Sequence, residues 1–196
     1  MKGLLMLKTD AINLCLRYTG EAPLPEGTTL ESLDPQHEAN IISQIIDETK
    51  AKIALQGWWF NTETWEFQPD STTGKIQLSD NILYLKSDTG NYLLRGTTLY
   101  NADDKTYNFT SPVAATVVWD LKFEELPTSF AFYTAYTAAQ EAQMLFSSDS
   151  TINTDLAKRI SEAFIRLQRE HLRYSSHNLI EGQRIISRTS NPVGVI

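Results

Sequence analysis

The periodicity of the apolar residues changes twice along the chain, and these two changes constrain the fold more than any other feature. Apolar residues recur at helical spacing up to Gly57 and again after Pro127. Between them, from Trp58 to Lys122, short apolar runs alternate with turn-forming clusters, a pattern typical of antiparallel strands. We therefore predict an α+β fold. Its helical body of about four helices comes from residues 1–57 and 123–175, and residues 58–122 form an inserted antiparallel β-sheet unit.

The first two predicted helices carry recognisable end signals. Thr9–Tyr18 reads as a short helix that stops at Gly20. Asp34 and Pro35 predict the start of a long helix, because aspartate caps free N–H groups and proline suits the first turn. Glycine in a left-handed conformation is expected to end this helix at Gly57. Its predicted buried face follows a helical spacing: Ile42, Ile45, Ile46, Thr49 and Ile53.

The middle of the chain predicts a sheet of about four to six strands. Each candidate strand is a short apolar run, and the runs are Trp58–Phe60, Ile82–Leu85, Tyr92–Leu94 and Val113–Trp119. Clusters rich in Asp, Asn, Ser, Thr and Gly separate them, at residues 69–74, 87–91 and 101–104. Such clusters favour turns rather than continued strands.

Two further helices are predicted after Pro127. Thr128 or Ser129 should cap the first, which is rich in small residues and runs to about Phe146. Small residues allow close approach of helices, either within one subunit or between neighbours. Thr151 or Asn153 should open the last helix, and we expect its Phe164 and Leu167 to pack against Ile45, Ile46 and Ile53 of the long helix. The apolar stripe of this last helix is Leu156, Ile160, Ala163, Phe164 and Leu167.

The helical pattern weakens beyond Tyr174, and residues 176–196 are predicted to form an extended C-terminal arm. Arginines and an apolar pair lie together in this arm: Arg184, Ile185, Ile186 and Arg188. Arginine can pair with carboxylates while isoleucine fills an apolar groove. We therefore expect these four residues to bind a partner protein.

Charge and composition exclude several classes of protein. The chain has 196 residues, a net charge of -7 and a single cysteine, so no internal disulfide framework is possible. Residues 158–196 hold 7 basic and 3 acidic side chains, whereas the rest of the chain is strongly acidic. An acidic protein is a poor general binder of nucleic acid. No run approaches the ~18 apolar residues of a membrane helix, so we expect no membrane contact.

No catalytic motif stands out. The sequence contains neither a G-x-S-x-G elbow nor a Walker or Rossmann glycine pattern. His171 and His177 are six residues apart, which is not the i, i+4 spacing of a helical metal pair. Cys15 lies among apolar residues and reads as a small buried hydrophobe. We therefore predict no catalytic residue, no metal and no cofactor.

The tryptophan-rich segment supports an alternative function. It comprises Trp58, Trp59, Phe60, Trp65 and Phe67. Tryptophans stack on sugar rings, so the alternative hypothesis is a glycan-binding module or an enzyme that degrades polysaccharide or the cell wall. The simpler interpretation is that these rings fill the core where the sheet leaves the helix. Exposure of Trp58 and Trp65 would favour the sugar-binding interpretation.

Several landmarks in order resemble a known family. Gly20-Glu21-Ala22-Pro23 follows a short helix, a long helix ends in Gln56-Gly57-Trp58-Trp59-Phe60-Asn61, and Phe123-Glu124-Glu125-Leu126-Pro127 leads into another helix. This arrangement, over roughly residues 9 to 180, resembles the tail tubular protein A family, the head-to-tail adaptor of short-tailed phages. The resemblance implies a ring of twelve subunits between a portal protein and a hexameric nozzle protein, the tail tubular protein B-like partner.

The resemblance also implies a place for each predicted contact. The protein would be made in the cytoplasm of the host bacterium and reside in the virion tail, and DNA would pass through the ring without specific binding. No catalytic residues are implied. The arm would reach the portal, and the turn Asp88-Thr89-Gly90 of the β unit is our candidate for nozzle contact, because turns on a rigid scaffold often carry binding groups.

Overall fold

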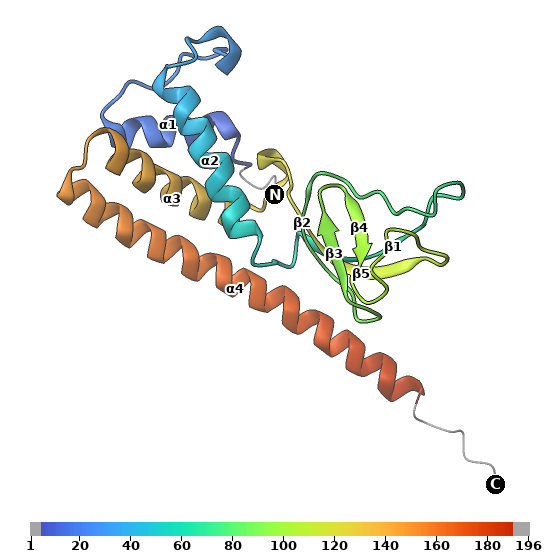
Figure 1. Cartoon of the computed structure of the whole chain (residues 1–196). Helices are drawn as coiled ribbons and strands as arrows, with labels where there is room; N and C mark the ends of the chain where they lie inside the picture. Colours follow the sequence, from blue (N-terminus) through green and yellow to red (C-terminus); the bar gives the residue numbers. More distant parts are fainter. Residues whose placement is uncertain (1–4, 190–196) are drawn as a thin grey trace.

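The computed structural model describes residues 5–189, with side chains described for residues 5–175. Over this range the chain forms a helical body and a separate β unit, as Figure 1 shows. The α+β fold is therefore confirmed. The helices are α1 (Lys8–Thr19), α2 (Glu38–Ala54), α3 (Thr128–Phe146) and α4 (Ser150–Thr189), with short 3-10 turns at Leu30–Ser32 and Phe123–Glu125. The strands are β1 (Thr62–Phe67), β2 (Ile82–Lys86), β3 (Tyr92–Arg95), β4 (Thr98–Asn101) and β5 (Val113–Trp119).

Helix α3 lies at the centre of the helical body. It packs against α1, α2 and α4, so the long helix α2 and the last helix α4 share one core chiefly through α3 rather than by direct packing. Ile46, Ile53 and Leu167 are buried in this one core, with Ile45 and Phe164 packed against it, but α3 makes most of the contacts between the two helices. The small residues of α3 face this core and are buried within the subunit: Ala131, Ala135, Ala138, Ala139 and Ala142. These small side chains let α3 pack closely against helices of the same subunit.

The helix starts differ from the predicted ones by a few residues. Helix α2 begins after His37, whose Nδ1 accepts a hydrogen bond from the Ala39 N–H at 3.1 Å. Asp34 instead stabilises the preceding turn, where its carboxylate accepts from the Gln36 N–H at 2.8 Å. Helix α3 starts directly after Pro127 rather than behind a Thr128 or Ser129 cap. A carboxylate caps α4, since Asp149 accepts from the first free N–H groups.

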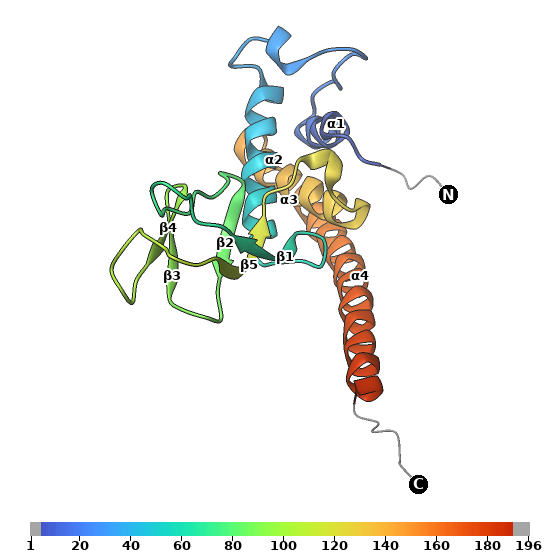
Figure 2. The same ribbon diagram turned by 90° about the vertical axis from the view of Figure 1, so that its right-hand side faces the viewer.

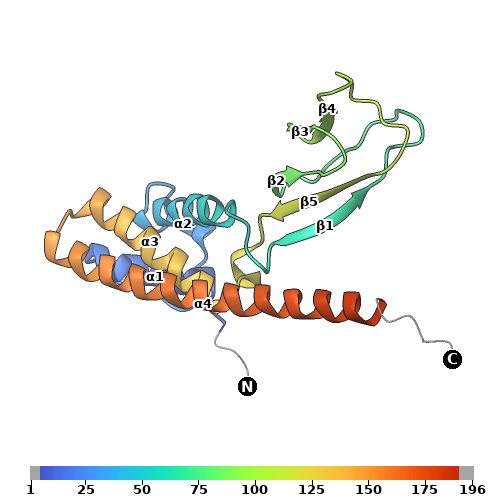
Figure 3. The same ribbon diagram turned by 90° about the horizontal axis from the view of Figure 1, so that it is seen from below.

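Helix α4 is longer than its apolar stripe predicts. Leu156, Ala163 and Leu167 of the stripe are buried, as expected. The helix nevertheless continues to Thr189, well past Tyr174, so the first part of the predicted arm has a helical backbone. Figures 1 and 3 show this part of α4 running beyond the helical body. No proline interrupts the helix before Pro192, and a helix can continue without a buried stripe when nothing breaks it.

The β unit contains two small sheets instead of one. The first has the antiparallel order β1-β5-β2, with Thr62 opposite Val118, and the second is the β3-β4 hairpin. They enclose a second hydrophobic core, which is built around Ile76, Leu99 and Val117. Figure 2 shows the β unit standing to one side of the helices. Two separate cores explain why the unit has its own shape.

The first predicted strand, Trp58–Phe60, is a turn that belongs to the helical core. Trp58 is only 5% exposed, and its indole N–H donates to the Ile53 carbonyl at 2.9 Å. The turn follows Gly57, which has a φ of 75° and ends the α2 segment in the predicted left-handed conformation. A Cβ at Gly57 would meet the Thr62 hydroxyl at 3.2 Å. Strand β1 starts only beyond this turn.

Candidate functional site

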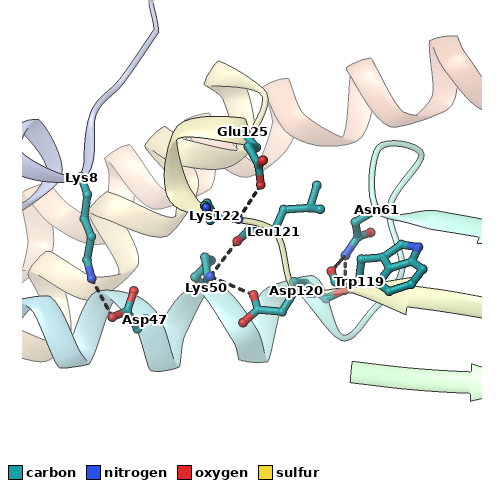
Figure 4. Close-up of polar contacts among 10 residues, drawn as sticks. Lys8, Asp47, Lys50, Asn61, Trp119, Asp120, Leu121, Lys122 and Glu125 are labelled. Atoms are coloured by element: carbon teal, nitrogen blue, oxygen red, sulfur yellow. Dashed lines mark hydrogen bonds and ion pairs between the residues drawn. The ribbon is translucent and has the colours of Figure 1, made fainter. Parts of the chain in front are cut away.

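Two chain segments connect the helical body with the β unit, and buried polar groups hold both of them. We call residues 55–61 and 119–122 the joint (Figure 4). Asn61 is 1% exposed and lies between the segments. Its amide nitrogen donates to the carbonyls of Ala54 at 3.1 Å and Trp119 at 3.0 Å, while its oxygen accepts from the Trp58 N–H at 2.8 Å. One side chain thus satisfies three backbone groups, at the end of α2, in the first segment and in the second.

Lys50 fixes the second segment of the joint to α2. Its ammonium group is largely buried and lies 2.8 Å from the Asp120 carboxylate, and it donates to the Leu121 carbonyl at 2.7 Å. A buried lysine needs such partners, because an unpaired buried charge costs several kcal/mol. Figure 4 also shows Lys8 of α1, which pairs at 2.6 Å with Asp47 of α2. The orientation of the β unit is therefore set by specific contacts with α2.

An aromatic cluster holds α4 at the same joint. Trp59 stacks on Tyr174 with a ring-centroid distance of 5.4 Å and an interplanar angle of 4°. His171 lies edge-on to Trp58 at 5.3 Å and tilted against Trp59 at 5.9 Å. We call Trp58, Trp59, His171 and Tyr174 the aromatic clamp. It marks the last described contacts of α4 with the body, so one turn positions both the β unit and α4.

The predicted nozzle turn lies on the surface of the β unit, between β2 and β3. Asp88 and Thr89 are exposed and Gly90 is half-buried. Hydrogen bonds hold the turn against β5. The Ser87 hydroxyl donates to the Ala114 carbonyl at 2.7 Å and also contacts the Thr89 hydroxyl at 2.9 Å. Its residues are therefore accessible and well positioned.

The predicted portal-binding residues lie in the last part of α4. Arg184, Ile185, Ile186 and Arg188 belong to the helical backbone, but their side chains lie outside the described residues. The structure therefore places the two predicted contact sites on different elements, the turn between β2 and β3 and the last part of α4.

The residues of the tryptophan-rich segment differ in burial, which bears on the choice between a core role and sugar binding. Trp58 is buried, Phe67 belongs to the core of the β unit, and Trp65 is 51% exposed on β1. Trp65 lies edge-on to Trp119 at 6.2 Å. Only one of the two tryptophans that would favour sugar binding is therefore exposed.

Cys15 is buried in the helical body. Burial raises the pKa of the Cys15 thiol to about 12, which confirms its interpretation as a small buried residue. Among the described residues, no three His, Cys, Asp or Glu side chains come together as a metal site would require. Within the same range, no helix has both the length and the apolar character needed to cross a membrane.

Sequence reasoning missed the residues of the joint. Asn61 entered only as part of a motif, and His171 only as a metal-ligand candidate. Lys50 carried a usable signal: it lies four residues after Ile46 and three before Ile53, so helical spacing places it on the buried face of α2. A lysine on a buried face implies a specific carboxylate or carbonyl partner.

Within the described residues, these features define a protein of two parts, a helical body with a long projecting helix and a β unit fixed to it by a buried polar joint. Comparison with known proteins gives the particular family. A model of the tail tubular protein family matches residues 9–177. The chain is also 30% identical over 171 residues to Tail tubular protein A of Klebsiella phage KP34, covering 86% of this chain and 88% of that protein. The chain belongs to the tail tubular protein family and is a structural component of a phage tail.

Proposed function

We propose that this protein is the head-to-tail adaptor of a short-tailed phage, a non-enzymatic ring that joins the portal to the tail nozzle. The observation that carries the proposal is the arrangement around the joint. Two elements leave the helical body there, the β unit and the distal part of α4, and the same short segments fix both. A connector between two partners needs two binding elements held in a constant relation. The similarity to a Tail tubular protein A supports this role.

The ring would contain twelve copies and surround the DNA. A net charge of -7 for each subunit disfavours strong contacts with phosphate groups, so DNA could slide through the lumen. The partners would be the portal protein above, the tail tubular protein B-like nozzle protein below and other copies of this chain at the sides. No specific DNA contact is proposed.

Removal of the arm tests the portal contact. Deleting residues 176–196 keeps the aromatic clamp, because His171 and Tyr174 remain. We expect an unchanged circular-dichroism spectrum and melting temperature but no binding to the purified portal. Deleting only residues 190–196 is the matched control, since Arg184 to Arg188 are retained. Unaltered portal affinity of the longer deletion would show that the arm is not the docking element.

The β turn is tested separately against the nozzle protein. The double substitution Asp88→Asn and Thr89→Ala should leave folding intact, because the Ser87 contact with β5 remains. We expect weaker attachment of the nozzle protein to adaptor rings that carry these substitutions. Asp80→Asn, another exposed aspartate of the β unit, is the control. Equal attachment in both variants would place the nozzle contact elsewhere.

A glycan-binding or polysaccharide-degrading role is favoured by one observation, the exposed Trp65. Binding of the full chain to host polysaccharide, measured by calorimetry and lost in Trp65→Ala, would support it. Release of soluble sugar fragments would establish a degrading enzyme. The adaptor proposal predicts neither binding nor release.

A further inference from the structure

The outward side of α4 combines apolar and basic residues. Ile165 is 44% exposed and Leu172 is 66% exposed, and Arg169 lies between them at helical spacing. Arg166 and Arg173 flank this stripe and are exposed too. These five residues form what we call the α4 outer face. Ile165 and Arg169 lie on the side of the helix away from the buried stripe. Arg166 also lines a groove against α3, and Leu172 lines one against the turn after α2. No ion pair within the described residues engages Arg166 or Arg169.

A surface of complementary character lies in the connection between α1 and α2. Leu30, Leu33 and Pro35 line a groove of about 390 Å³ against the first turns of α2, with the Glu31 carboxylate among its lining residues. Asp34 lies between Leu33 and Pro35 in the chain and is exposed. We call this the α1–α2 groove. Between Arg17 and Lys50 the chain has seven carboxylates and no lysine or arginine.

These two surfaces belong to different parts of the subunit. The α1–α2 connection lies at the end of α2 that is far from the joint, whereas residues 165–173 of α4 lead up to the aromatic clamp at the joint (Figure 1). The charge balance follows the same division. Residues 1–149 hold 10 basic and 20 acidic side chains, whereas residues 150–196 hold 7 basic and 4 acidic ones. The most basic element of this acidic protein is therefore a different part of the fold from its most acidic segment.

We propose that the α4 outer face of one copy docks in the α1–α2 groove of a second copy. Ile165 and Leu172 would be covered by the leucines and proline of the groove, and Arg169 would pair with Glu31. Apolar burial gives such a contact its stability, while the opposite charges select the partner and speed the encounter. Because the two surfaces differ, the contact is head-to-tail and can close into a ring.

This inference rests on the ring that the proposed function requires and names the surfaces that form it. It assigns residues 165–173 to contact between copies and leaves the arm beyond residue 175 for the portal. Charge complementarity is the reason for choosing a second copy as the occupant. Between acidic copies, a contact that pairs the basic α4 outer face with an acidic segment reduces the repulsion between like charges.

A charge swap tests the contact directly. The full chain is purified in four forms: wild type, Arg169→Glu, Glu31→Lys, and an equal mixture of the two variants. Sedimentation velocity at low salt measures self-association over a wide concentration range. We expect the wild type to associate and each variant alone to associate at least about tenfold more weakly. The mixture should recover association, because each reversed surface then meets its reversed partner on the other variant.

Two matched controls separate this contact from a general effect of charge. Lys86→Glu and Glu66→Lys make the same reversals on exposed strand residues of the β unit and should associate like the wild type. Circular dichroism establishes that each variant is folded. A wild type that stays monomeric at every concentration overturns the proposal, and so does a mixture that associates no better than its components. Portal binding is measured separately, so failure of this contact differs from failure of the adaptor role.

Discussion

Asn61 is the residue on which the joint depends most. Its side chain makes three hydrogen bonds, to Ala54, Trp58 and Trp119, and is almost completely buried. No other amino acid offers both a donor and an acceptor of this size and shape. Removing the amide leaves buried backbone groups without partners, and each such group costs about 1–3 kcal/mol.

Asn61→Ala should lower the free energy of unfolding by about 2–4 kcal/mol, because water replaces only some of the lost hydrogen bonds. Denaturant unfolding followed by fluorescence measures this value. Asn108→Ala, at an exposed position of the β unit, is the control and should change stability by less than about 0.5 kcal/mol. If the two variants lose equal stability, the joint does not depend on Asn61.

Cys15 gives stability a dependence on alkaline pH. The pKa of its thiol is about 12 in the folded protein, whereas a thiol in an unfolded chain has a pKa of about 8.5. The unfolded chain therefore loses this proton first as the pH rises. The protonated thiol contributes fully to the free energy of unfolding below pH ~8.5. This contribution falls, by up to ~1.4 kcal/mol per pH unit, as the pH rises from there to the pKa of the folded state.

Comparison with Cys15→Ala isolates this effect from other titrating groups. The stability difference between wild type and variant, measured by urea unfolding from pH 7 to 10.5, should be constant up to about pH 8.5. Above that pH, the wild type should lose stability faster than the variant. Parallel curves over the whole range would contradict the buried, protonated thiol.

At the scale of single elements, α2 and α4 meet the joint but are held by different contacts. Helix α2 is held along its length by the core, whereas α4 leaves the body at the aromatic clamp. The stacked pair of Trp59 and Tyr174 contributes about 0.5–1.5 kcal/mol beyond its buried area. The clamp thus determines how much of α4 is held in place.

Trp59→Ala should therefore loosen α4 more than it destabilises the protein as a whole. We expect faster hydrogen exchange in the backbone of α4 around His171 and Tyr174, with little change in α1 and α2. Trp65→Ala, which removes an exposed ring from β1, is the control and should leave α4 unchanged. Uniform acceleration over all helices would mean that the clamp supports the whole body and not this helix in particular.

The sequence predicted the elements better than their ends. Periodicity located all four helices and the strand-rich middle, because both depend on local apolar spacing. It placed Trp58–Phe60 in a strand, since apolar runs of this length look alike in strands and turns. The hydrogen bonds from the Trp58 indole to the Ile53 carbonyl and from the Asn61 N–H to the Trp58 carbonyl distinguish the two. Asp34 was a plausible cap, but His37, closer to the helix, occupies that position.

At the scale of the whole molecule, the residues that relate the parts to one another were invisible in the sequence. Lys50 and Asp120 are 70 positions apart, and their ion pair forms only because α2 and the end of β5 meet at the joint. The candidate contact sites differ from the joint, because they could be proposed from the sequence. Surface turns and charged helix ends are recognisable from composition, since they need no partner within the chain. The fold places the candidate contact sites on two different elements, the β unit and the distal part of α4, that both leave the helical body at the joint.

Native mass spectrometry of the chain mixed with the portal protein of its phage tests the adaptor role most directly. The adaptor account predicts a complex with twelve copies of the chain on each portal ring, which then also binds the nozzle protein. Deletion of residues 176–196 should abolish this complex while leaving a folded chain. A portal ring whose mass does not change in the presence of the full chain would contradict the proposed function.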